Sequence, residues 1–186
     1  MITIVSGLPR SGTSLMMQML ASGGMSVLTD LERKPDIDNP RGYFEWEPAK
    51  LLPIDPRRID EAEGKAVKVV TPLLLSLPRG RDYRVIFMER RLAEVLASQD
   101  KMLSRRGTNI PADHAMVASG FRDHMKELVA WLEERPEIPV HRVGFRKLLG
   151  NPYEIATAVR AFLALDLNAE SMARTVDPAL YRNRHP

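Results

Sequence analysis

ITIVSGLPRSGTSLMMQML, residues 2–20, is the stretch from which the fold of this chain can be inferred. Residues 2–5 are rich in β-branched side chains, which suit a buried parallel strand. A loop of Gly, Ser and Thr follows, and residues 13–20 are mostly apolar and predict a helix. Because a strand, a tight turn and a helix N-terminus together form an anion cradle, this stretch predicts a phosphate-binding loop.

The loop has the residue types that such a cradle needs. Gly7 and Gly12 permit unusual backbone angles and the close approach of an anion. Ser11, Thr13 and Ser14 add hydroxyl donors to the N–H groups of the loop. A helix that begins near Thr13 would also direct its unpaired N–H groups and its positive dipole end at the anion. We therefore expect a ligand that carries phosphate.

The basic residue of the loop is not where a nucleoside triphosphate enzyme places it. The spacing of Gly7 and Gly12 fits the triphosphate P-loop, but that motif requires Lys directly after the second glycine. Here Thr13 follows, and the basic residue is the earlier Arg10. Because the lysine reaches the outer phosphates in ATP and GTP enzymes, its absence weakens a kinase or NTPase interpretation.

The segment PRSGTS, residues 9–14, resembles the 5′-phosphosulfate loop of sulfotransferases that use 3′-phosphoadenosine 5′-phosphosulfate (PAPS). Members of that family carry Pro-Lys/Arg-Ser-Gly-Thr-Thr/Ser there. The resemblance, to a small bacterial-type member, implies PAPS as cofactor, 3′,5′-phosphoadenosine (PAP) as product and no metal. The residues that it implies for cofactor binding in this loop are Arg10, Ser11, Gly12, Thr13 and Ser14. An ordinary strand-turn-helix corner is the alternative.

Lys68 lies in a second predicted strand, AVKVV, at residues 66–70. Cytosolic sulfotransferases carry Val-Lys-Thr-His-x-Pro at this place, so the resemblance implies that Lys68 assists the leaving group, together with Arg10. Val70 stands where the family has its histidine base. Without the resemblance, Lys68 is a strand-end lysine that extends its ammonium to solvent.

Arg90 lies at the junction between the predicted strand 83–88 and a predicted helix over 91–106, and Ser98 lies in that helix. The family has Arg-x-Pro-x-x-x-x-x-Ser at this turn, and the resemblance implies that Arg90 and Ser98 bind the 3′-phosphate of the cofactor. Leu92 replaces the family's proline. A guanidinium and a hydroxyl suit a phosphate monoester chemically.

A polar segment rich in proline contains the sequence NPRGYFEW, residues 39–46, which looks like a segment of many bacterial sulfotransferases. Aromatic residues in a hydrophilic loop predict that the loop folds over something. Some Golgi-type members use a glutamate from the segment after the phosphate loop, so we predict Glu45 as the base. The open alternatives are Glu32, Asp36 and Glu47, or a loop anchored by its aromatic residues with Glu45 merely solvated.

The composition indicates which kind of protein this is. The chain has 186 residues, 44% hydrophobic and 27% charged, which predicts one soluble domain over 1–186. No apolar run approaches the ~20 residues that span a membrane. The net charge of +3 does not indicate nucleic acid or a membrane surface as partner, and cysteine is absent. The start lacks a signal-peptide pattern, so we expect a cytoplasmic protein.

Strands and helices alternate along the chain, which predicts a three-layer α/β fold with a mainly parallel, P-loop nucleotide-binding sheet. Further predicted elements are a strand at 25–28, an amphipathic helix at 118–132, a strand at 140–145 and a helix from 151. We expect residues 30–64 and 104–111 to be substrate or lid loops. The basic tail, residues 181–184, could complete the 3′-phosphate pocket or could be frayed.

The predicted function is transfer of a sulfuryl group from PAPS to a hydroxyl or amine of a small-molecule or glycan acceptor. A small-molecule or nucleotide kinase and a non-catalytic protein that binds PAP or PAPS are the alternatives.

Overall fold

The structure is a computed structural model that describes residues 1–30, 32–37, 39–105, 107 and 114–177. Its sheet has five parallel strands in the order β2-β3-β1-β4-β5. The strands are β1 (Ile2–Gly7), β2 (Val27–Leu28), β3 (Ala66–Lys68), β4 (Tyr83–Glu89) and β5 (Val140–Gly144). The α-helices are α1 (Thr13–Ser22), α2 (Thr71–Leu74), α3 (Leu92–Arg105), α4 (His114–Glu133), α5 (Phe145–Gly150), α6 (Pro152–Leu163) and α7 (Ala169–Arg174). Two 3₁₀ helices, η1 (Glu47–Leu51) and η2 (Pro56–Ala62), precede β3.

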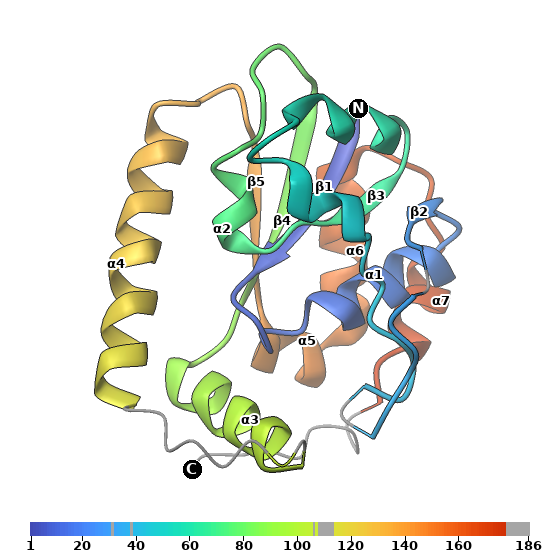
Figure 1. Cartoon of the computed structure of the whole chain (residues 1–186). Coiled ribbons are helices and arrows are strands. Elements are labelled where there is room, and N and C mark those ends of the chain that lie inside the picture. The colour runs from blue at the N-terminus through green and yellow to red at the C-terminus, as the bar shows by residue number, and fades with distance from the viewer. Residues whose placement is uncertain (31, 38, 106, 108–113, 178–186) are drawn as a thin grey trace.

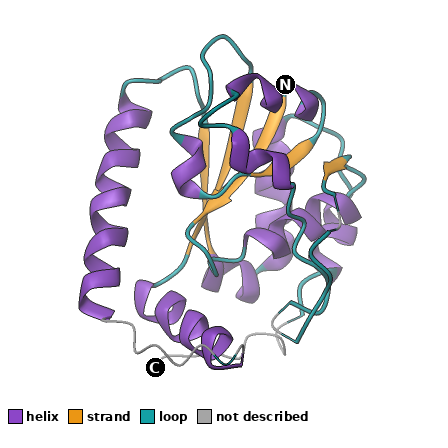
Figure 2. Cartoon of the chain, viewed as in Figure 1, coloured by secondary structure: helices purple, strands orange, loops and turns teal. Residues whose placement is uncertain are grey.

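The sheet is the middle of three layers, and Figures 1 and 2 show its strands between two groups of helices. Side chains alternate between its faces, as the pleat of a strand requires. In β4, Val85 joins the core formed with η1, η2, α2 and α4, whereas Ile86 joins the core formed with α1, α5, α6 and α7. The predicted three-layer α/β fold with a parallel sheet is confirmed.

The order of the strands places three chain segments at one edge of the sheet. From β1 the chain goes first to β2 and β3 on one side, and later to β4 and β5 on the other. The carboxyl ends of β3, β1 and β4 therefore lie side by side, and such a switch in strand order is where open α/β sheets bind ligands. Lys68 ends β3, the phosphate loop follows β1, and Arg90 follows β4.

Several predicted boundaries differ from the observed ones. The predicted strand at 25–28 is shorter, since β2 contains Val27 and Leu28 alone. The predicted strand at 140–145 ends at Gly144, whose extended backbone caps α5, so Phe145 begins a helix instead of ending a strand. The segment 30–64 is not one loop, because η1 and η2 in its second half contribute buried residues to the core.

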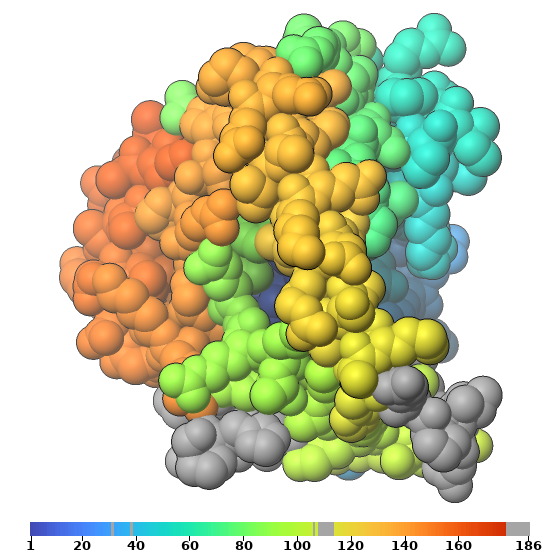
Figure 3. Space-filling view, turned by 90° about the vertical axis from the view of Figure 1, so that its left-hand side faces the viewer, coloured from blue at the N-terminus to red at the C-terminus, as the bar shows by residue number. Residues whose placement is uncertain are grey.

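Helix α4 is longer and more exposed than the amphipathic pattern predicts. It spans His114–Glu133, and Leu128 is its buried residue. It contacts α2 and α3, and Leu128, Met125 and Leu132 face the core. In the space-filling view from its side, α4 forms a raised ridge of yellow atoms over the body of the protein (Figure 3).

None of the helices in the described part of the chain is both long enough and apolar enough to cross a bilayer.

Tyr83, the first residue of β4, is a buried phenol in the core between the sheet and η2. Its hydroxyl donates to the Pro78 carbonyl at 3.1 Å. Burial raises the pKa of Tyr83 from 10.0 to about 12. Between these two pH values the unfolded chain loses the phenol proton while the folded chain keeps it, so the free energy of unfolding falls as the pH rises above 10.

We predict that Tyr83→Phe removes this loss of stability. At neutral pH the variant should be less stable than the wild type by roughly 0.5–1.5 kcal/mol, the net contribution of one hydrogen bond. At pH 11 the difference should shift in favour of the variant by about 1.4 kcal/mol, and urea unfolding at both pH values measures it. Tyr153→Phe is the control, because that ring is exposed. An equal effect of both substitutions would contradict the prediction.

Candidate active site

The phosphate loop between β1 and α1 approaches its neighbours so closely that glycine is required. Gly12 has φ +105°, and a Cβ atom there would lie 2.6 Å from the Phe145 ring. Gly7 has φ +151°, and a Cβ atom there would lie 2.7 Å from the Met88 carbonyl oxygen. The two glycines therefore let the loop pack closely against β4 and α5.

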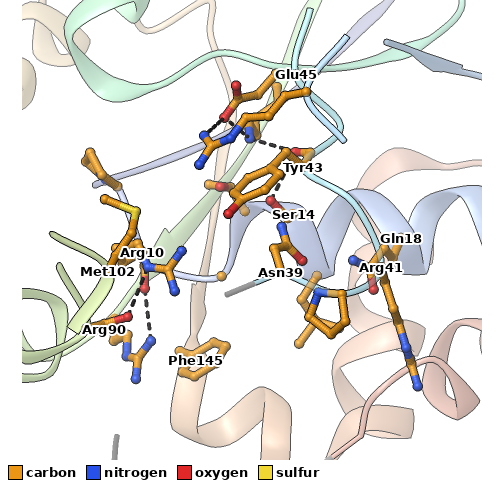
Figure 4. A pocket seen from close by; sticks show the side chains of 18 of the residues that line it. Arg10, Ser14, Gln18, Asn39, Arg41, Tyr43, Glu45, Arg90, Met102 and Phe145 are labelled. Carbon is orange, nitrogen blue, oxygen red and sulfur yellow. Dashed lines mark hydrogen bonds and ion pairs between the residues drawn. The ribbon is translucent and has the colours of Figure 1, made fainter. Parts of the chain in front are cut away.

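Arg10 is held at both its backbone and its side chain. Its φ of +69° is unusual for a residue with a side chain. The Nε of Arg10 donates to Ser98 Oγ at 2.9 Å, and the Arg10 carbonyl accepts from the Nη1 of Arg90 at 3.0 Å. The segment that follows β4 thus fixes the conformation of the phosphate loop, and Figure 4 shows Arg10 and Arg90 on one side of the pocket.

Arg90 is largely buried and makes contacts in three directions. Besides the Arg10 carbonyl, it donates from Nε to Glu94 Oε2 at 3.1 Å. Its guanidinium lies 4.5 Å from the centroid of the Phe145 ring. Glu94 also accepts from Arg146 Nε at 2.8 Å.

Lys68 is buried at the carboxyl end of β3, with 8% of its surface exposed. Its Nζ donates to the Tyr43 carbonyl at 2.7 Å and lies 3.3 Å from Glu45 Oε1. Burial lowers the pKa of the Lys68 ammonium below its ordinary value, and the nearby Glu45 carboxylate opposes that shift. The interpretation of Lys68 as a lysine extended to solvent is therefore wrong.

The segment around Tyr43 folds over the first turn of α1. The Tyr43 carbonyl that accepts from Lys68 also accepts from Ser14 Oγ at 3.0 Å. Arg33 lies over the Tyr43 ring, 3.3 Å from its centroid, and its Nη1 donates to Glu45 Oε1 at 2.9 Å. Glu45 is thus placed between two cations instead of being merely solvated, and the predicted aromatic anchoring of the loop is confirmed by the burial of Tyr43 and Trp46.

A cavity of about 420 Å³ lies over these residues (Figure 4). Ligand pockets typically have volumes of about 300–1,000 Å³. Its basic lining residues are Arg10, Arg33, Arg41, Lys68, Arg90, Lys101 and Arg105, and its acidic ones are Glu45 and Asp177. This excess of positive charge suits a ligand with several negative charges.

Most of the predicted site residues line this one cavity. They are Arg10, Gly12, Thr13, Ser14, Glu45, Lys68, Arg90 and Ser98. Ser11 is different: its hydroxyl is buried next to Gly7 and has no hydrogen-bond partner among the described residues. Ser11 can therefore contribute its backbone to an anion site, but in this conformation its hydroxyl does not face the cavity.

Among the four acidic residues considered for the base, Glu45 is the one that lines the cavity. Asp36 accepts a hydrogen bond from the Tyr43 hydroxyl at 2.7 Å, and Glu47 pairs with Lys50 on the surface. Glu32 is exposed. Val70 lines the cavity at the position of the family's histidine.

Two predicted segments fall largely or wholly outside the described residues. Of residues 104–111, Ser104 and Arg105 belong to the end of α3, and Gly107 lies in a turn. The remaining five residues of that segment and the tail at 181–184 are not described.

Two residues of the site, Arg33 and Glu94, were not predicted from the sequence. Glu94 could have been found from its place four residues after Arg90 on a predicted helix, whereas no pattern pointed to Arg33.

Comparison with known proteins extends these observations. No protein-family model matches the sequence, and no curated protein sequence matches it either. Among solved structures, the sulfotransferase domain from the curacin biosynthetic pathway is similar, with a TM-score of 0.56 and 13% identity over 100% of this chain and 92% of that one. The sulfotransferase domain from the Synechococcus PCC 7002 olefin synthase has a TM-score of 0.59 and 13% identity over 100% of this chain and 88% of that one. The chain has the sulfotransferase fold.

Proposed function

We propose that the chain transfers a sulfuryl group from PAPS to a hydroxyl or amine of a small-molecule or glycan acceptor. One observation carries this proposal: the phosphate loop, the Arg90–Ser98 pair and the Lys68–Glu45 pair line a single basic cavity. The Arg90–Ser98 pair adds donors beside those of the phosphate loop, which suits a ligand with a second anionic group. The absence of lysine after Gly12 points the same way.

The proposed chemistry is an in-line displacement. PAPS supplies the sulfuryl group, the acceptor oxygen or nitrogen forms the new bond to sulfur, and the bond between sulfur and the 5′-phosphate oxygen breaks. Negative charge collects on the leaving oxygen, so positioning and electrostatic stabilisation account for most of the acceleration in this kind of transfer.

Lys68 and Arg10 are the residues that would neutralise that charge. Both line the cavity, and each is already oriented by hydrogen bonds to protein atoms, Lys68 by the Tyr43 carbonyl and Arg10 by Ser98. Preoriented cations stabilise developing charge without further reorganisation, which is why such groups contribute strongly to catalysis.

Glu45 is the residue that would receive the proton of the acceptor. Its carboxylate lines the cavity and lies 3.3 Å from the ammonium of Lys68, so the base and the cation for the leaving group are neighbours. Arg33 holds the same oxygen at 2.9 Å and fixes the orientation of the carboxylate.

A non-catalytic protein that binds PAP or PAPS is the second candidate. Val70 in place of the family's histidine favours it, because a valine side chain can accept no proton. This candidate predicts the same cofactor binding and no turnover.

We predict that PAP stabilises the protein against heat more than ATP with magnesium does. At one hundred times its dissociation constant, PAP should raise the melting temperature by roughly 5–10 °C. Arg90→Ala should remove most of this shift, because the 3′-phosphate loses its guanidinium. Arg142→Ala is the matched control, since Arg142 pairs with Glu89 outside the cavity. A larger shift with ATP and magnesium, or no effect of Arg90→Ala, would reject PAPS as cofactor.

We predict that Glu45→Gln abolishes sulfuryl transfer and leaves the PAP-induced shift intact. A general base contributes about 10² to 10⁴ in rate, and a glutamine cannot take the proton. Transfer from radiolabelled PAPS to a panel of phenols, amines and sugars measures the activity. Glu47→Gln is the control, because Glu47 pairs with Lys50 and does not line the cavity. Wild-type activity in Glu45→Gln would rule out this base, and a wild type inactive on every acceptor while binding PAP would favour the non-catalytic candidate.

A further inference from the structure

Glu94 is a charged residue with no exposed surface, buried in the first turn of α3 next to the cavity. A carboxylate is taken out of water at a large free-energy cost unless it is paired and hydrogen-bonded. Here both of its oxygens are paired: Oε2 accepts from Arg90 Nε at 3.1 Å, and Oε1 accepts from Arg146 Nε at 2.8 Å. The proposed chemistry assigns no role to this acid.

Arg90 lies just before α3, and Glu94 and Ser98, four residues apart, lie on one face of that helix. Ser98 holds the side chain of Arg10, and Arg90 holds the Arg10 carbonyl. Glu94 stands between them in sequence and fixes Arg90. Two residues on one face of α3 therefore hold the site: Glu94 binds the Arg90 guanidinium, and Ser98 binds the Arg10 side chain of the phosphate loop.

The contacts of Arg90 fix the plane of its guanidinium. A guanidinium has its donors in a rigid planar fork, so two hydrogen bonds in different directions determine how the whole group is oriented. Those two contacts are the one to Glu94 and the one to the Arg10 carbonyl, and the Phe145 ring supports the flat face at 4.5 Å. Removing the carboxylate would leave Arg90 charged and buried, but without the contact that orients its Nε.

We propose that Glu94 is a positioning residue for the anion site: it holds Arg90 in the orientation that binds a phosphate monoester. This inference rests on the proposed function, in which Arg90 contacts the 3′-phosphate of PAPS. It adds that the preference for a 3′-phosphorylated nucleotide depends on a residue that does not line the cavity.

The chain offers a matched comparison for this role. Glu89 and Arg142 also form a carboxylate–guanidinium pair, at 2.8 Å, but their side chains are 45% and 51% exposed and neither lines the cavity. Neutralising Glu89 removes the same kind of contact from a neighbouring part of the chain without touching Arg90.

The test measures the dissociation constants of PAP and of adenosine 5′-monophosphate by calorimetry for the wild type, Glu94→Gln and Glu89→Gln. The two nucleotides differ only in the 3′-phosphate. The dissociation constant of adenosine 5′-monophosphate divided by that of PAP therefore measures how well the 3′-phosphate is recognised. We expect Glu94→Gln to lower that ratio on the order of tenfold, because a hydrogen bond from a charged donor to an amide replaces one to a carboxylate. Glu89→Gln should leave the ratio unchanged. Because a loss of folded protein affects both nucleotides alike, a merely structural role would not change the ratio.

Circular dichroism shows whether Glu94→Gln folds. If it does not, Glu94→Asp retains the charge and withdraws the carboxylate by one methylene, and it should lower the ratio by a smaller factor. An unchanged ratio in the folded variant would overturn the positioning role while the proposed function stands. A wild type that binds both nucleotides equally, or neither, would overturn the proposed function and this inference with it.

Discussion

The pairing of β1 with β3 on one side and with β4 on the other is the constraint on which the rest of the structure depends. It brings the carboxyl ends of three parallel strands together at one edge of the sheet. In that register Val5 of β1 is opposite Lys68 and Gly7 is opposite Met88, so the phosphate loop begins between the lysine and the segment that leads to Arg90. Without this arrangement, residues far apart in the sequence could not share a cavity.

Backbone carbonyl groups organise the cations of the site. The Tyr43 carbonyl accepts from both Lys68 and Ser14, and the Arg10 carbonyl accepts from Arg90. Carbonyl oxygens orient positive groups without neutralising them, so the cavity keeps an excess of positive charge. The carboxylates of Glu45 and Glu94 do neutralise charge, one beside the proposed reaction centre and the other behind Arg90.

The fold could be predicted from the sequence because its signals are local. The strand, loop and helix of residues 2–20 and the later alternation of elements indicated a parallel three-layer sheet. The place of Arg90 and Ser98 near the phosphate loop was implied by the resemblance of their strand-to-helix turn to that of sulfotransferases, because their spacing alone indicates little. Alternating strands and helices place the carboxyl ends of the parallel strands at one edge of the sheet. Most residues of the candidate cavity follow such strand ends, so they could be predicted to lie together.

The features that could not be predicted from the sequence lie in irregular segments, where the path of the backbone follows no periodic pattern. Phe44, which follows the Tyr43 carbonyl that accepts from Lys68, has a positive φ of 52°, and no periodicity predicts such a bend. The partners of Glu45 and the buried hydroxyl of Ser11 are tertiary features of the same kind. Helix α4 was predictable for the opposite reason: its apolar face is a periodic pattern, and Leu128, Met125 and Leu132 pack against the core with η1, η2 and α2.

A crystal structure of the protein with PAP tests the central claim most directly, because it shows which groups hold each phosphate. We expect the 5′-phosphate on the backbone of residues 10–14, within hydrogen-bond distance of Arg10 or Lys68, and the 3′-phosphate on Arg90 and Ser98. PAP bound outside the cavity, or with its 3′-phosphate on the phosphate loop, would contradict it.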